Sequence, residues 1–168
     1  NLDKFLVKFR NNTINYVYNL HTFYLIARYL KSLPEEIGLL TNLRTLSFYT
    51  NQLQSIPKEI GLLTNLQKLY FDVNQLKSLP KEIGSLINLK LLILSDNQLR
   101  SLREEIGSLT NLKYLDLDKN QLKFFPQEIC LLTKLKNLYL NNNKLKFLPK
   151  EIGLLTNLRQ LCLADDRL

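Results

Sequence analysis

Few side chains in this sequence are placed to carry out chemistry. The 168 residues contain one histidine, His21, and no Cys, His or carboxylate accompanies it at a metal-ligand spacing. Asp116 and Asp118 are the nearest carboxylates on one face, and paired carboxylates are what a glycosidase requires. They fall on a predicted open sheet, however, and not in a pocket that would raise the pKa of one of them. Because the motifs G-x-S-x-G, H-E-x-x-H and C-x-x-C are also absent, we expect no enzyme activity, no metal site and no cofactor.

The two cysteines, Cys130 and Cys162, are predicted to be unpaired. They occupy different positions of the repeat described below, so the thickness of the core should separate them. A disulfide requires two Cα atoms within about 7 Å. The given sequence also contains no apolar stretch of membrane-spanning length and no recognisable signal peptide.

A 23-residue repeat must position all of these residues. The five glycines and the five prolines each recur at intervals of 23 or 46. Aligning the sequence on the pattern L-x-x-L-x-L-x-x-N-x-L gives repeats that start at Leu20, Leu43, Leu66, Leu89, Leu112, Leu135 and Leu158. The first copy is degenerate, with Arg28 where the pattern has Asn. We therefore expect one continuous domain of seven repeats over residues 20–168, preceded at 1–19 by an N-terminal cap, as an amphipathic helix or a worn repeat.

Each repeat combines two periodicities. In the first half Leu69 and Phe71 alternate with polar residues, which predicts a short strand. In the second half Ile83 lies four residues after Leu79, and Pro80 is suited to start a turn of α-helix or 3-10 helix. Neither half can bury its apolar side alone, so successive repeats should stack. The predicted fold class is α/β, a solenoid with a parallel sheet on the concave side and short helices or 3-10 turns on the convex side.

The wording LPKEIGLLTNLQKLY, repeated with small changes, resembles the leucine-rich-repeat family, and in particular a 23-residue bacterial subgroup of the leptospiral type. The resemblance covers residues 20–168. It implies a right-handed arc or horseshoe used for protein recognition, often secreted or exposed on the cell surface. The sequence departs from the pattern with Arg103 for Pro, Cys130 for Gly and Lys134 for Asn. We expect these departures to affect local turns and not the fold.

Two recurring polar columns have structural explanations. Asparagine follows each strand at Asn51, Asn74, Asn97, Asn120 and Asn143. A buried amide at this point can satisfy main-chain groups of adjacent repeats, each of which costs about 1–3 kcal/mol if unpaired. Glutamate stands early in each helical segment at Glu36, Glu59, Glu82, Glu105, Glu128 and Glu151. A carboxylate there favours the positive end of the helix dipole.

The concave face holds the candidate binding residues. They are Tyr49, Tyr70, Asp72, Leu91, Ile93, Tyr114, Asp116, Asp118 and Tyr139, all at predicted outward positions. Rigid amphipathic tyrosines are enriched at protein interfaces. An alternative is that tyrosine and isoleucine are present only because they favour strands. Since strands do not need exposed apolar neighbours, we favour a protein-binding patch centred on Tyr70, Leu91, Ile93 and Tyr114.

The net charge of +8 is not spread evenly. The concave face is expected to be net negative. Two basic stripes are expected along its edges, one at Arg44, Lys90, Lys113, Lys136 and Arg159 and one at Lys31, Lys77, Arg100, Lys123 and Lys146. Such stripes favour solubility, and a glycosaminoglycan-like polyanion is the alternative. We expect no DNA binding, because we find no aromatic residues interleaved with the stripes and no element suited to a DNA groove.

Three functions remain at this point. The first is an exported bacterial surface or secreted protein, extracellular or on the cell surface, that binds a host or extracellular protein through its concave face. The second is an intracellular scaffold that uses the same face, which would place it in the cytoplasm. The third is a polyanion binder. The apolar residues of the last repeat further suggest either a longer native chain or end-to-end self-association.

Overall fold

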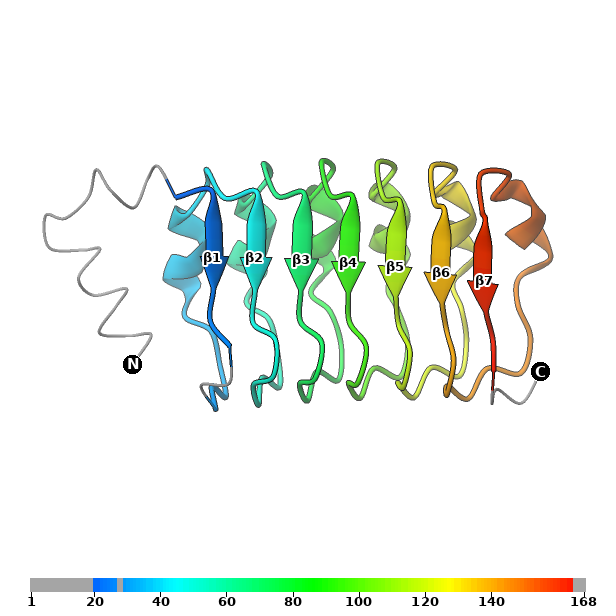
Figure 1. The fold of residues 1–168 in the computed structure, drawn as a ribbon, viewed down its shortest axis with the longest axis horizontal. Helices are drawn as coiled ribbons and strands as arrows, with labels where there is room; N and C mark the ends of the chain where they lie inside the picture. The colour runs from blue at the N-terminus through cyan, green and yellow to red at the C-terminus, as the bar shows by residue number, and fades with distance from the viewer. Residues whose placement is uncertain (1–19, 27–28, 165–168) are drawn as a thin grey trace, which may run out of the picture.

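The computed structural model describes residues 20–26 and 29–164, and it forms a solenoid with one sheet on its front and short helices behind it (Figure 1). All strands of the described part are parallel and pair in chain order. The strands are β1 (Thr22–Tyr24), β2 (Thr45–Ser47), β3 (Lys68–Tyr70), β4 (Leu91–Ile93), β5 (Tyr114–Asp116), β6 (Asn137–Tyr139) and β7 (Gln160–Cys162). The predicted fold class is confirmed. The predicted cap at 1–19, Arg28 and residues 165–168 lie outside the described residues.

Strand register follows the repeat length without a slip. Leu69 pairs with Leu46 on one side and with Leu92 on the other, each 23 residues away. These central leucines are fully buried, and the first and third residues of the strands are at least partly exposed except for the buried Ser47 in β2. Because side chains alternate along a strand, one register places the central residues of β1 to β6 in the core and their neighbours on the open face.

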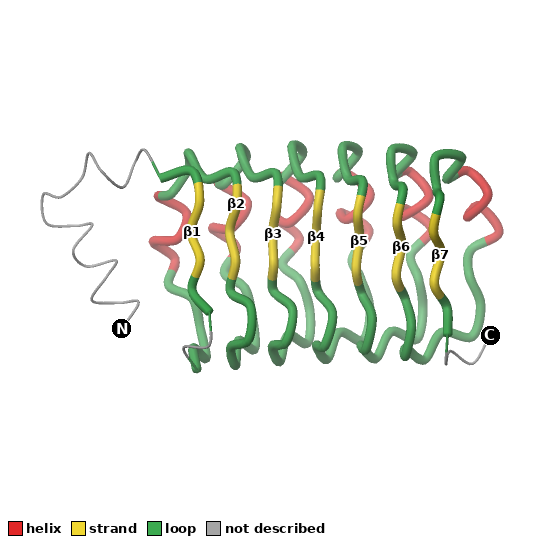
Figure 2. Tube along the Cα trace, viewed as in Figure 1, coloured by secondary structure: helices red, strands yellow, loops and turns green. Residues whose placement is uncertain are grey.

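The second half of each of the first six repeats contains a 3-10 helix of five residues (Figure 2). These helices are η1 (Glu35–Leu39), η2 (Lys58–Leu62), η3 (Lys81–Ser85), η4 (Glu104–Ser108), η5 (Gln127–Leu131) and η6 (Lys150–Leu154). The main-chain N–H of Ile83 donates to Pro80 O at 3.1 Å, and the N–H of Leu86 donates to Ile83 O at 3.1 Å. These hydrogen bonds join residues three positions apart, so of the two predicted alternatives the 3-10 helix is the one formed.

The departure at Arg103 does not alter its turn. Arg103 precedes η4 with φ −83° and ψ 155°, and Pro80 precedes η3 with φ −68° and ψ 150°. The proline fixes a conformation that other residues can also adopt. The repeat therefore tolerates the loss of this proline.

Aliphatic and aromatic side chains from both halves fill the space between sheet and helices. Phe48 and Phe71 are fully buried and their rings stack with centroids 5.6 Å apart. Ile60 and Ile83 reach the same core from the 3-10 helices. Leu161 in β7 is 38% exposed, although the equivalent Leu138 in β6 is fully buried, because among the described residues β7 pairs with a neighbour on one side only. The core at β7 therefore lacks the cover that the next repeat provides at β6.

Candidate functional site

The side chains of the asparagine column that follows the strands form hydrogen bonds with main-chain atoms. Asn97 accepts a hydrogen bond from the Leu76 N–H at 2.9 Å through Oδ1, and its Nδ2 donates to Phe71 O at 2.9 Å and to Leu94 O at 3.1 Å. Two of these partners belong to the preceding repeat. The same set of bonds recurs at Asn51, Asn74, Asn120 and Asn143. These side chains are buried, so they are not available to bind a ligand.

A second amide column lies at the last position of the repeat, directly before the leucine that starts the next one, and the sequence alone did not indicate its role. Asn65 donates to Thr41 O at 2.9 Å and Asn88 donates to Thr64 O at 2.9 Å, again one repeat back. Lys134, which replaces asparagine in this column, donates through Nζ to Asn111 Oδ1 at 2.7 Å. The departure at Lys134 therefore keeps a bond between the two repeats.

The sheet face is the surface whose side chains belong neither to the core nor to the asparagine columns. We define it as the first and third residue of each strand together with the residue two positions beyond the strand. The structure brings the predicted central residues together there, since Leu91 pairs with Tyr114 and Tyr70 pairs with Ile93 on adjacent strands. The Tyr114 ring lies 5.2 Å from the ring of Tyr139 on β6. Burial, followed by the neighbouring Tyr139, raises the pKa of Tyr114 above its usual value.

Four acidic side chains on or beside the sheet face differ in how their charge is compensated. Asp96 forms a salt bridge with Lys119 at 3.5 Å. Asp118 accepts two hydrogen bonds from Asn141, at 2.7 Å from its main-chain N–H and at 2.9 Å from its Nδ2. Asp116 accepts the main-chain N–H of Asp118 at 3.0 Å. Burial, with the charge of Asp118 acting in the same direction, nevertheless raises the pKa of Asp116, so the expectation that the open sheet would leave this pair unshifted is wrong. Asp72 differs from the other three in having a buried oxygen without a hydrogen-bond partner.

Asp72 is half-buried, and one oxygen of its carboxylate is unsatisfied. Its Oδ1 atom is buried and has no hydrogen-bond partner among the described residues, and no salt bridge within the described part reaches it. Burial raises the pKa of Asp72, with Asp116 and Asp96 acting in the same direction. A buried charged atom without a partner is costly. Asp72 is therefore the acid on this face with the most to gain from a ligand.

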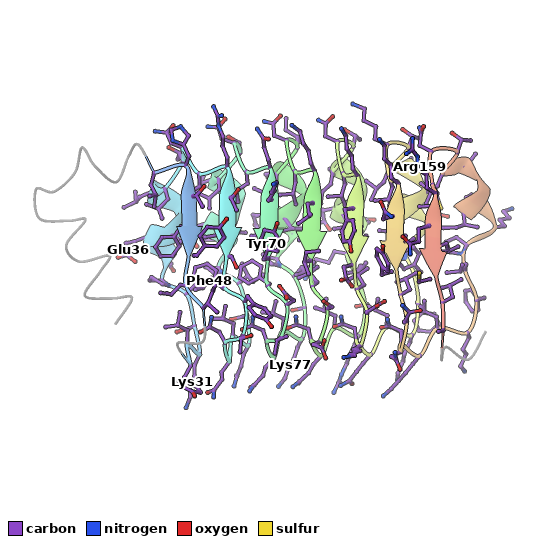
Figure 3. The ribbon with its side chains drawn as sticks, viewed as in Figure 1. Lys31, Glu36, Phe48, Tyr70, Lys77 and Arg159 are labelled. Atoms are coloured by element: carbon purple, nitrogen blue, oxygen red, sulfur yellow. The ribbon has the colours of Figure 1, made fainter. Side chains whose placement is uncertain are left out.

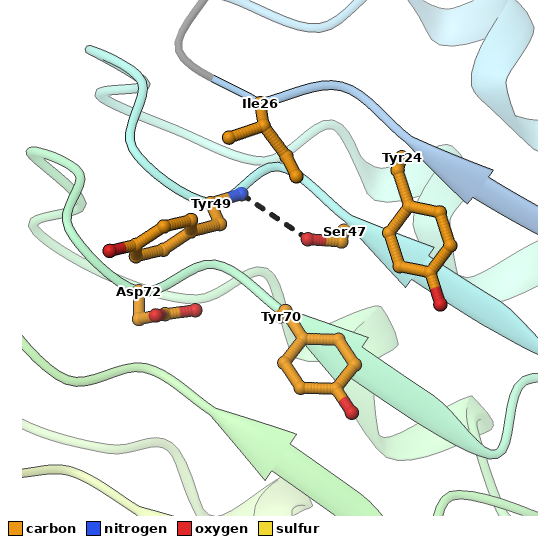
Figure 4. A pocket seen from close by; sticks show the side chains of 6 residues that line it. All are labelled: Tyr24, Ile26, Ser47, Tyr49, Tyr70 and Asp72. Carbon is orange, nitrogen blue, oxygen red and sulfur yellow. Dashed lines mark hydrogen bonds between the residues drawn. The ribbon is translucent and has the colours of Figure 1, made fainter.

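A hollow of about 240 Å³ lies beside Asp72 at the first three repeats (Figure 4). Its lining consists of Tyr24, Ile26, Ser47, Tyr49, Tyr70 and Asp72. Ser47 is small, is 4% exposed and stands on β2 between strands that carry Tyr24 and Tyr70 at the same position. A serine between two tyrosines leaves a gap, because adjacent strands are about 4.8 Å apart. Tyr49, Tyr70 and Asp72 were predicted from the sequence as binding residues, whereas Tyr24, Ile26 and Ser47 were not. The signal for Ser47 is a small residue in a row of large ones.

The basic stripes lie along the two edges of the sheet, and Figure 3 shows Lys31 and Lys77 on one edge and Arg159 on the other. The structure corrects one expectation about them. Phe124 and Phe147 are 57% and 58% exposed, with ring centroids 6.2 Å apart. Each directly follows a stripe lysine, Lys123 or Lys146. Aromatic side chains thus do accompany one end of the stripe, where earlier repeats have serine.

The described residues offer little else for chemistry. Residues 20–26 and 29–164 contain no group of three His, Cys, Asp or Glu side chains able to hold a metal ion. Cys130 and Cys162 are free thiols. None of the helices in the described part has the length and apolar character that a membrane crossing requires.

Comparison with known proteins agrees with this architecture. Residues 76–167 match the family profile described as a leucine-rich repeat region, and no curated protein matches the sequence. A leucine-rich-repeat protein of Leptospira interrogans is 38% identical over 92% of this chain, with a TM-score of 0.69. An internalin from Listeria monocytogenes is 28% identical over 86% of this chain, with a TM-score of 0.74.

A plant peptide hormone receptor, solved in complex with RGF2, is 33% identical over 80% of this chain, with a TM-score of 0.73. The chain spans 51% of the Leptospira protein, 42% of the internalin and 22% of the receptor. The family profile covers more than half of the 168 residues, and the described residues form the matching solenoid. The chain therefore belongs to the leucine-rich-repeat family.

Proposed function

We propose that this chain is a non-enzymatic protein-binding module whose sheet face contacts a protein partner. The observation that carries the proposal is the set of tyrosine and aliphatic side chains on the sheet face, which neither the core nor the asparagine columns use. Tyr24 and Tyr49 are 58% and 42% exposed. Short parallel strands hold these side chains on a rigid frame, which lowers the entropy lost when a partner binds.

Tyr70, Leu91, Ile93 and Tyr114 form the centre of this binding surface in our proposal. They occupy three adjacent strands and are each half-buried by their neighbours. Aromatic and aliphatic side chains near the middle of a contact surface supply most of the binding energy of typical interfaces. Asp116, Asp118 and Tyr139 continue the same surface toward the last repeats and would contribute polar contacts.

We further propose that the protein is exported from a bacterium and acts at the cell surface or outside the cell, on a host or extracellular protein. The similarity to a Leptospira protein and to an internalin supports a bacterial source. An intracellular scaffold is the competing proposal. A leader peptide encoded upstream, together with digestion of the protein by protease added to intact cells, would support export, and protection from that protease would contradict it.

A polyanion is the alternative ligand. The exposed stripe residues Lys123 and Lys146 favour a glycosaminoglycan-like polyanion, because clustered positive charge attracts chains that carry repeated negative groups. Binding through this edge should weaken steeply as salt rises. A heparin affinity column run at increasing salt, with Lys123→Ala and Lys146→Ala together as the variant, separates this proposal from binding through the sheet face.

The decisive experiment replaces Ile93 with aspartate. Candidate partners are captured on the immobilised chain from extracellular matrix and from host cell extract. We expect a partner of the sheet face to be lost with Ile93→Asp and retained with Lys113→Ala, a variant of an exposed residue on the basic edge. The thermal transition should change little in both variants, because Ile93 faces solvent in part. Equal capture by Ile93→Asp and by the parent would contradict the proposal.

A further inference from the structure

The hollow at the first three repeats differs from the rest of the sheet face in having both aromatic walls and an uncompensated acid. We propose that it is a subsite for one arginine side chain of the protein partner, with the guanidinium between the tyrosines and against the Asp72 carboxylate. This proposal rests on the proposed function of the sheet face and deepens it, since it states which chemical group of the partner the first three repeats select.

The size of the hollow fits one side chain. Its volume of about 240 Å³ is below the range of about 300–1,000 Å³ found for pockets that enclose small-molecule ligands. It is open toward solvent, and Figure 4 shows the side chains that line it. A long side chain projecting from a partner's surface can enter it, whereas a free cofactor or metabolite would remain largely exposed.

The walls favour a flat cation. Tyr24 and Tyr70 stand on either side of Ser47, and Tyr49 lies at the edge beside Asp72 (Figure 4). Cations are attracted to the faces of aromatic rings, and the planar guanidinium of arginine also stacks on them. The Ser47 hydroxyl accepts the Tyr49 main-chain N–H at 3.4 Å, so the floor of the hollow is a polar atom already engaged by the backbone.

The charge of the hollow selects the sign of its occupant. Asp72 has a buried oxygen without a partner, and none of the salt bridges in the described part involves it. By contrast, Asp96 is balanced by Lys119. A guanidinium in the hollow would supply the positive charge that no salt bridge of the described part gives Asp72, and its rigid fork of donors suits a carboxylate. An acidic or neutral occupant would leave that carboxylate uncompensated.

Two capped peptides test the subsite directly. The first is the pentapeptide Gly-Gly-Arg-Gly-Gly, acetylated and amidated at its ends. The second has citrulline in place of arginine, which keeps the shape but removes the charge. Each is titrated into the full ¹⁵N-labelled chain while amide shifts are followed by NMR. We expect saturable shifts at Ser47, Tyr49 and Asp72 with the arginine peptide, and affinity for the citrulline peptide lower by about tenfold or more.

Three variants locate the contact. Asp72→Asn should lower the affinity for the arginine peptide by about tenfold, because it keeps the shape of the hollow and removes the charge. Asp96→Asn removes the same charge from an acid already paired with Lys119, and we expect a loss of less than about twofold. Ser47→Leu fills the gap between the tyrosines and should abolish the shifts. Circular dichroism and the thermal transition of each variant verify that it is folded.

The outcomes separate this subsite from the wider proposal. Equal binding of the two peptides, shifts confined to other repeats, or equal losses for Asp72→Asn and Asp96→Asn would each overturn the arginine subsite. If a captured partner is lost with Ile93→Asp but bound normally by Asp72→Asn and Ser47→Leu, the sheet face binds the partner and the arginine subsite is wrong. If the peptide binds in the hollow but Ile93→Asp keeps its partners, the subsite stands and the proposed centre of the face is wrong.

Discussion

Gly84 faces the main-chain oxygen of Glu105 in the next repeat so closely that a Cβ atom on Gly84 would lie 2.7 Å from it. The same approach recurs between Gly61 and Glu82 at 2.8 Å, and between Gly107 and Glu128 at 2.7 Å. Adjacent 3-10 helices therefore touch through backbone atoms. The glycine and glutamate columns of the sequence form the two sides of this contact.

Gly84→Ala should destabilise the chain by about 1–3 kcal/mol, because the new methyl group meets backbone that cannot move without shifting the stack. The matched control is Gly153→Ala, since among the described residues nothing lies within 4 Å of a Cβ at that position. We expect the control to be neutral or slightly stabilising, because alanine restricts the unfolded chain. Urea unfolding of both variants makes the comparison. Equal losses would mean that the close approach does not limit the packing.

Asn97→Ala should cost about 1–3 kcal/mol, because it leaves the buried Leu76 N–H without its acceptor and removes one of the two amide donors to Phe71 O. Asn88→Ala is the control, since Asn88 also donates to a main-chain oxygen, Thr64 O, but is exposed. There water can replace the lost bond, and we expect a change below about 0.5 kcal/mol. Chemical denaturation monitored by circular dichroism tests the pair. If Asn97→Ala unfolds at the same urea concentration as the parent, the buried bonds do not support stability.

Val73 adopts a left-handed backbone conformation with φ 54°, which a β-branched residue rarely takes. The equivalent Asn142 has φ 56°. Because asparagine tolerates this region, Val73→Asn should stabilise the chain by about 1 kcal/mol. Val73 is 38% exposed, so the change also loses some apolar burial, which keeps the net gain below the about 1–2 kcal/mol that the left-handed conformation costs. The reciprocal change Asn142→Val should destabilise by a similar amount, and a thermal melt in which both variants shift in the same direction would contradict this explanation.

Asp72→Asn should stabilise the unliganded chain at pH 7 and lose that advantage in acid. Burial raises the pKa of Asp72, and Asp116 and Asp96 add to the shift. The folded state therefore binds the Asp72 proton more tightly than the unfolded state does. The contribution of Asp72 to stability then falls as pH rises from its unfolded pKa, about 3.9, through its raised folded pKa.

The measurement compares the unfolding free energies of parent and Asp72→Asn at pH 7 and at about pH 3, where the Asp72 carboxyl of the parent is protonated in both states. The increase in unfolding free energy caused by Asp72→Asn should be present only at the higher pH. A gain of the same size at both pH values would assign it to packing and not to charge.

The repeat period was sufficient to predict the strands, their parallel order and the face on which Tyr70 and Ile93 meet, because stacking at a fixed spacing converts sequence columns into rows in space. The choice between α-helix and 3-10 helix was not available from the spacing of Leu79 and Ile83, which suits both. The hollow was missed because Ser47 carries no signal until its neighbours on the adjacent strands are considered. The left-handed turn was missed because its column contains no glycine.

The asparagine bonds have one direction, since each amide binds its own repeat and the repeat before it. The main contacts between elements likewise join equivalent elements of adjacent repeats. The solenoid is thus a linear array in which cooperativity passes only between nearest neighbours, so a weakened interface divides the chain into two parts that unfold separately. A partner bound across several strands would contact several repeats at once. Its binding energy would couple repeats that have no contact of their own, and the bound protein would then unfold as a single unit.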